Sequence, residues 1–201
     1  SGVKFTGSNL TNARFGSATL TGTDFTDTNL TGAYFYSASL TNAIFTDSTI
    51  TNANFSSTNF MADQLYSTAS YKEKNISGIN FDGNNLSGWN FKDQNLDGSR
   101  FFNATLTGAD FTGAKISGTI LSAAVAKGFT VDNLYSTASY ANKDLHGINL
   151  SNNNLSGWNF KDQNLDGANF YGSTLTGTNF TGAKIKGAVL EGAVAKGFTV
   201  D

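Results

Sequence analysis

Large apolar residues recur at every fifth position through the first sixty residues. The series runs without a gap through Phe5, Leu10, Phe15, Leu20, Phe25, Leu30, Phe35, Leu40, Phe45, Ile50, Phe55 and Phe60. A period of five matches neither an α-helix, with its period of 3.6, nor a β-strand, with its period of two. The remaining possibility is a set of short units that stack and bury each other's faces. The pattern therefore predicts a solenoid.

The residues around each anchor also repeat. Small residues such as Ala13 stand two positions before it, Thr6 and its equivalents follow it, and glycine or a turn-forming residue such as Asp27 comes next. This order resembles the pentapeptide-repeat family, in its tandem-module type. The resemblance covers most of the chain. It implies an all-β solenoid, a right-handed quadrilateral β-helix with one pentad per side and four pentads per turn.

With four sides per turn, residues twenty positions apart stack on each other. Phe5, Phe25 and Phe45 are then expected in one column, and Phe15, Phe35 and Phe55 in the facing column. Each buried Phe contributes about 1.5–3 kcal/mol. The predicted structural core consists of Phe5, Phe15, Phe25, Phe35, Phe45, Phe55, Phe91, Phe111, Phe160 and Phe180.

The five-residue frame breaks twice, near 61–75 and 122–144, and a longer repeat lies above it. The segment LYSTASY at 65–71 returns at 134–140, and AVAKGFTVD at 124–132 returns at 193–201. Both segments return at the same interval. These copies divide the chain into a first β-helical block, 1–60, and two supermodules, each a short helix followed by a β-helical block, 61–132 and 133–201.

The two interruptions are interpreted as short helices. Thr130 is the expected N-cap of the second, whereas Met61 stands at that place in the first and caps it less well. Leu134, Ala138 and Ala141 are expected on one helical face. Helices this short are marginal alone, so we expect them to dock on the adjacent coils.

The first turn of each supermodule is specialised. Trp89 and Trp158 stand where other pentads have a small residue, and Asn or Gln breaks the same rule nearby. We predict that each Trp packs under the LYSTASY helix and that the amides satisfy polar groups there. The alternative is a ligand site at these junctions, formed by Trp89, Trp158, Tyr66, Tyr71, Tyr135 and Tyr140.

Residues that carry catalytic chemistry are scarce. His146 is the single histidine, cysteine is absent, and neither a GxGxxG nor a phosphate-loop pattern occurs. The sequence therefore predicts no enzyme activity and no catalytic, cofactor-binding or metal-binding residues.

Composition limits the partners. Thirteen basic residues offset fifteen acidic ones, and no basic patch appears, so a nucleic-acid partner is not expected. No apolar run is long enough to span a membrane. The lack of cysteine favours an extracellular or cell-surface location. Because the sequence starts at Ser1 without Met, we expect a processed chain or a fragment.

Three functional hypotheses follow. The first is a non-enzymatic structural rod that assembles end to end through open β-helix ends, with itself as partner. The second is a protein-binding module of a larger exported or surface protein. The third is DNA mimicry toward a topoisomerase, which the resemblance suggests and the near-neutral charge disfavours. The columns of Thr also raise ice binding, although Thr is ordinary at strand positions.

Overall fold

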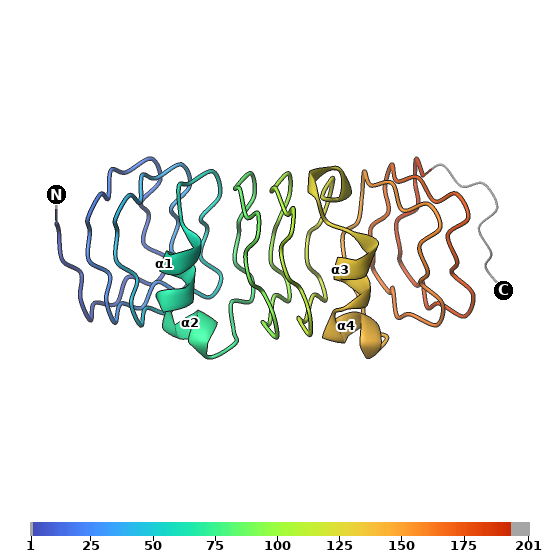
Figure 1. Cartoon of the computed structure of the whole chain (residues 1–201), viewed down its shortest axis with the longest axis horizontal. Coiled ribbons are helices and arrows are strands. Elements are labelled where there is room, and N and C mark those ends of the chain that lie inside the picture. The colour runs from blue at the N-terminus through green and yellow to red at the C-terminus, as the bar shows by residue number, and fades with distance from the viewer. Residues whose placement is uncertain (1, 194–201) are drawn as a thin grey trace.

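The chain folds into a single stack of coils along one axis (Figure 1). The computed structural model describes residues 2–193. Isolated parallel bridges join residues twenty apart, as in Lys4 to Asp24 and Asn9 to Asn29, so a regular coil has twenty residues and four sides. We name the sides after the anchors of the first coil: the Phe5, Leu10, Phe15 and Leu20 sides.

A turn follows each anchor and forms a corner of the coil. The N–H of Ser8 donates to the carbonyl of Phe5 at 2.9 Å, and the N–H of Ala13 donates to that of Leu10 at 3.0 Å. The third residue of each turn has a positive φ, +67° at Gly7 and +58° at Asn12. Glycine and asparagine adopt this conformation most readily, which explains why they follow the anchors by two positions.

The predicted all-β character is present only in part. The described residues contain isolated bridges and no extended strand or sheet. Each five-residue side spends two residues in its turn, so pairing cannot run along consecutive residues. The coils are held together by one bridge per side rather than by ladders.

The aromatic columns lie where the period predicts them. Rings twenty residues apart stack, with centroids 5.5 Å apart for Phe5 and Phe25 and 5.1 Å apart for Phe15 and Phe35. The two columns meet edge to face, as in Phe25 and Phe35 at 5.7 Å and 84°. The predicted core residues from Phe25 onward are buried, whereas Phe5 and Phe15 in the first coil are partly exposed.

Both interruptions contain short helices. The first holds α1 (Ala62–Ser67) and α2 (Ala69–Lys72). The second holds the 3-10 helix η1 (Val125–Lys127), α3 (Val131–Tyr135) and α4 (Ala138–Ala141). No helix within residues 2–193 is long and apolar enough to cross a membrane.

The predicted N-cap at Thr130 is confirmed, because its hydroxyl accepts from the N–H of Asn133 at 3.2 Å. The predicted helical face is wrong beyond Leu134. The helix α3 ends at Tyr135 with Ser136 as its C-cap, and Thr137 caps α4, its hydroxyl accepting from the N–H of Tyr140 at 3.1 Å. The direction therefore changes between Leu134 and Ala138. Leu134, Thr137 and Ser139 are buried, and Ala141 is exposed.

The helices form walls of their own coils. Leu65 and Leu134 are fully buried on the Phe5 side. The neighbouring coil pairs with the helix ends, because the N–H of Asp47 donates to Ser67 and that of Gly113 to Ser136. Each Leu therefore continues the column in which Phe stands elsewhere.

The coils that contain helices are longer than the others. Asn54 pairs with Asn80, and Ile120 pairs with Asn149, so both coils exceed the regular length and the second exceeds the first. These lengths produce the shifts in the five-residue frame. On the Phe15 side the bridges still run unbroken, in eight steps from Arg14 to Val189. The final copy of AVAKGFTVD lies outside the described residues from 194 onward.

Candidate functional site

Two tyrosines at each junction hold the backbone of the coil that follows. The hydroxyl of Tyr66 accepts from the N–H of Asn90 at 2.7 Å, and the hydroxyl of Tyr71 donates to the Asn90 carbonyl at 3.0 Å. The second junction repeats both bonds at Asn159. The phenols thus replace the backbone partners that a regular coil supplies.

The paired rings lie against each other. The centroids of Tyr66 and Tyr71 are 4.7 Å apart, and those of Tyr135 and Tyr140 are 4.5 Å apart. Burial raises the pKa of Tyr71 and of Tyr140, and the neighbouring tyrosine adds to each rise. The hydroxyls of Tyr71 and Tyr140 therefore stay protonated, as their donor bonds to the carbonyls of Asn90 and Asn159 require.

The Trp residues pack against core rings, and Trp89 also lines a pocket of about 290 Å³ beside Phe60 and Met61. Trp89 is 7% exposed and lies 5.5 Å from the Phe81 ring and 6.4 Å from the Phe60 ring. Trp158 is equally buried, and its ring is 6.5 Å from that of Phe129. Each indole thus packs on aromatic rings from the coils next to the helices.

The amides that break the small-residue rule bond to backbone at the junctions. Asn84 donates to the carbonyl of Phe55 at 2.9 Å and accepts from the N–H of Thr58 at 3.1 Å. Gln94 donates to Tyr71 and Gln163 donates to Tyr140, at 3.1 and 3.0 Å. The Oε1 atoms of both Gln residues are buried without a protein partner.

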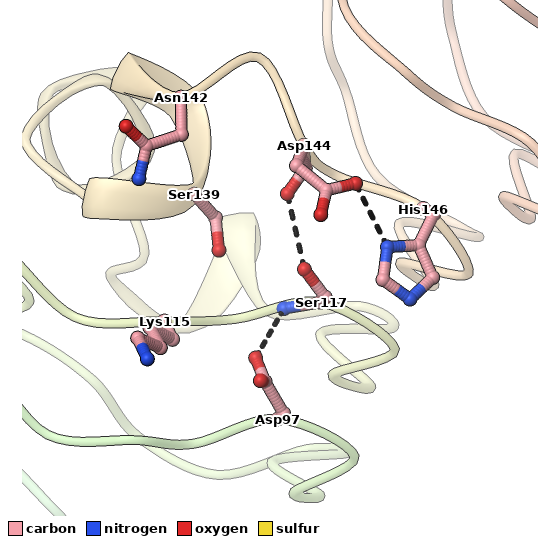
Figure 2. Close-up of a pocket in the computed structure, with 7 residues that line it drawn as sticks. All are labelled: Asp97, Lys115, Ser117, Ser139, Asn142, Asp144 and His146. Carbon is pink, nitrogen blue, oxygen red and sulfur yellow. Dashed lines mark hydrogen bonds and ion pairs between the residues drawn. The ribbon is translucent and has the colours of Figure 1, made fainter.

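A shallow hollow of about 260 Å³ lies beside α4 on the Leu10 side (Figure 2). Its ionisable residues are Asp97, Lys115, Asp144 and His146. The imidazole Nδ1 of His146 is 2.8 Å from a carboxylate oxygen of Asp144. The carboxylate of Asp97 accepts from the N–H of Ser117 at 2.9 Å. The hollow thus holds charges of both signs.

Hydrogen bonding at this hollow affects one carboxyl. The bond with His146 lowers the pKa of Asp144, partly offset by desolvation, and the charge of His146 and a bond from Asn164 lower it further. His146 is more than half exposed. Within residues 2–193 no group of three histidine, cysteine or acidic side chains is arranged to hold a metal ion.

The family model described as pentapeptide repeats matches the chain in eight copies. The matched segments are 1–35, 28–61, 85–122, 144–182 and 154–192, which together cover well over half of the sequence. The chain belongs to the pentapeptide-repeat family. Comparison with curated proteins found no match.

Several solved pentapeptide-repeat structures are similar to this member of the family. One is from the thylakoid lumen of Arabidopsis thaliana, with 26% identity over 58% of this chain and 66% of that one, just under two thirds, and a TM-score of 0.31. HetL, involved in heterocyst differentiation regulation in the cyanobacterium Nostoc, has 22% identity over 98% and 84%, with a TM-score of 0.25.

A third similar structure is QnrB1, a plasmid-mediated fluoroquinolone resistance protein. It has 19% identity over 100% of this chain and 86% of that one, with a TM-score of 0.28. Identities and scores at these levels establish no shared activity.

Sequence reasoning missed one surface feature of this pentapeptide-repeat chain. Tyr36, Phe102 and Tyr171 are 44%, 47% and 49% exposed, and each follows an anchor of the Phe15 side. We call these three residues the aromatic row. Tyr171 follows Phe102 at the interval of the supermodule, whereas the interval between Tyr36 and Phe102 is shorter. The first junction is the shorter one, which concealed the repeat.

Proposed function

We propose that the chain is a non-enzymatic structural rod, a right-handed quadrilateral β-helix, that acts as a scaffold outside the cell or on its surface. The observation that carries this proposal is the unbroken series of bridges from Arg14 to Val189 along the Phe15 side. A series that continues past both helical junctions favours a stiff rod over a chain of hinged domains.

The core supports the same proposal. Leu65 and Leu134 fill the Phe5 column at the two helical coils, and both are fully buried. A hinge needs a weakly packed segment, with few buried apolar contacts. The junctions instead bury an apolar side chain from the helix and fix the next coil through Tyr66 and Tyr135.

We also propose that the rods assemble end to end. In the second coil, the N–H groups of Asn29 and Tyr34 donate to the carbonyls of Ser8 and Ala13 in the first coil. Within residues 2–193 no coil precedes the first one, and its rings of Phe5 and Phe15 are partly exposed. Such an edge accepts a further coil, and we propose that a second copy supplies it.

Electron microscopy over a concentration series, with light scattering in parallel, tests assembly. Filaments whose axial repeat is a multiple of about 4.8 Å, the spacing between paired strands, are the expected result. Monodisperse short rods at every concentration would exclude end-to-end assembly.

Stiffness is tested separately. Because the chain contains no cysteine, Thr41→Cys with Thr176→Cys introduces two unique labelling sites, both on exposed residues of the Leu20 side. Six coil steps separate them, or about 29 Å at the usual strand spacing. A narrow distance distribution by pulsed electron resonance supports the rod, and a broad or bimodal one argues against it.

DNA mimicry is not part of the proposal. It needs a strongly negative surface, and the net charge here is −2. Several acidic groups are also neutralised locally, as in the pairs Arg100–Asp82 and Lys72–Asp47.

A further inference from the structure

The aromatic row stands on the one side whose bridges run unbroken through the described residues. Tyr36, Phe102 and Tyr171 each follow the anchor of their coil, so they occupy equivalent places on the Phe15 side. Between Tyr36 and Phe102 the bridges pass through Asn54 and Asn80, which makes three coil steps.

The second interval has the same length in space. Between Phe102 and Tyr171 the bridges pass through Ile120 and Asn149, again three steps. At about 4.8 Å per step, an exposed aromatic ring recurs every 14 Å or so along the rod. The two intervals span equal distances although they contain different numbers of residues, because the helical coils differ in length.

The surface between Tyr36 and Phe102 is hollowed and carries polar groups. A depression of about 260 Å³ lies between Tyr36 and Phe102, and Ser57, Asp82 and Asn103 contribute to its lining. The side chains of Ser57 and Asn103 belong to exposed residues, so their hydroxyl and amide are accessible. They offer donors and acceptors to a neutral polar ligand.

The charge inside this depression is already paired. The carboxylate of Asp82 accepts from Arg100 Nε at 3.0 Å and Nη2 at 2.7 Å, and its other oxygen accepts from the N–H of Phe102 at 2.7 Å. The pair fixes the backbone that carries the Phe102 ring. No net charge remains between the two rings.

These features exclude two classes of ligand. A stable protein interface has a contiguous apolar core, whereas Tyr36 and Phe102 are separated by a depression to which Ser57, Asp82 and Asn103 contribute. A nucleic acid needs a row of cations, and the Phe15 side has only Arg14 and the paired Arg100 among its outward residues within 2–193.

We propose that the Phe15 side binds an extended neutral polysaccharide along the rod. Sugar rings have apolar faces that stack on aromatic side chains, while hydroxyl groups at their rims bond to residues such as Ser57 and Asn103. A periodic polymer can engage all three rings of a periodic row at once. This inference is independent of end-to-end assembly.

Affinity electrophoresis of the purified chain in native gels tests the proposal. The gels contain hydroxyethylcellulose, a soluble β-1,3-glucan, a soluble α-glucan or, as an acidic polymer, alginate. Retardation by at least one neutral polymer is the expected result. No retardation by any neutral polymer, or retardation by alginate alone, would overturn the proposal.

Substitutions then locate the site. Tyr36→Ser, Phe102→Ser and Tyr171→Ser should each weaken binding about twofold to tenfold, the usual worth of one aromatic stacking pair. The triple variant should not bind. Ile44→Ser and Met61→Ser remove exposed apolar side chains from other sides, at 45% and 63% exposure, and should bind like the unaltered chain.

Two further measurements test whether the variants remain folded and whether the row binds a second copy. Circular dichroism melting should give the same transition for the triple variant and Ile44→Ser, because these residues are exposed, whereas Met61→Ser supplies an N-cap hydroxyl to α1 and should melt at the same or a higher temperature. Analytical ultracentrifugation identifies the competing occupant. If the unaltered chain associates side by side and the triple variant does not, the row binds a second copy and the polysaccharide proposal is wrong. Equal binding by the triple variant and the unaltered chain would also overturn it.

Discussion

The hydroxyl of Tyr66 accepts a hydrogen bond from the backbone N–H of Asn90 at 2.7 Å. The same bond joins Tyr135 to Asn159 at 2.6 Å. A side chain from a helix thus provides the acceptor that a backbone carbonyl provides between regular coils. The recurrence of this geometry in both junctions links the LYSTASY segment to the Asn between Trp and Phe in the following coil.

Tyr66→Phe is expected to destabilise the chain by about 0.5–1.5 kcal/mol, the net contribution of one hydrogen bond. Because Asn90 is exposed, water can satisfy part of the lost bond, so the lower end of this range is expected. Urea unfolding measures the change. Tyr171→Phe, which alters an exposed phenol away from the junctions, is the control. Equal effects from both variants would show that the junction bond is unimportant.

Phe35→Asp is expected to unfold the first block. The ring of Phe35 is fully buried and lies 5.0 Å from Phe55 and 5.1 Å from Phe15. A charge there has no partner, and its burial is costly. Phe35→Leu keeps an apolar side chain and should cost far less. Thermal melting by circular dichroism compares them, and an unchanged melting curve for the Asp variant would refute the column arrangement.

Capping distinguishes the two junctions. Thr130 caps α3, whereas the side chain of Met61 makes no such bond to α1. Thr130→Ala should destabilise by about 1 kcal/mol, and Met61→Thr should stabilise by a similar or smaller amount. Met61 is 63% exposed, so its replacement leaves no cavity. Urea unfolding of both single variants and of the double variant measures the pair. A destabilised Met61→Thr would contradict the prediction.

Acid should weaken the second junction through Asp144. The bond with His146 lowers the pKa of this carboxyl in the folded chain, so its ionised form stabilises the fold above the pKa of the unfolded chain. That contribution is lost as the pH falls through the lowered folded pKa. His146→Ala, which removes the bond to Asp144 and leaves no side-chain donor in its place, should raise the Asp144 pKa in an NMR titration. An unchanged titration would mean that the pair is not formed in solution.

The five-residue period was enough to place the columns and the two helical interruptions. Phe25 and Phe35 lie where the spacing puts them, and Thr130 begins the predicted helix. The break before Thr137 was not predicted. Leu134, Ala138 and Ala141 fit the period of a single helix, and that spacing gives no sign that the Thr137 hydroxyl caps a second helix.

The polar surface was harder to predict than the core. The association of Asp97 and Lys115 with Asp144 and His146 depends on how α4 sits on the preceding coil. The aromatic row depends on the lengths of the helical coils, because Tyr36 and Phe102 align only when Asn54 pairs with Asn80. The five-residue period alone does not give the number of residues in each helical coil.

The helical coils also govern how this chain can grow. Along the Phe15 side, three coil steps separate Asn80 from Asn149, and the two positions are equivalent in successive copies of the supermodule. Duplication of one supermodule therefore lengthens the stack by a whole number of coils. Each surface column continues in phase, with Phe102 followed by Tyr171 on the same side. Tandem duplication of the coding segment can thus lengthen the molecule while each side keeps the same type of residue at equivalent positions.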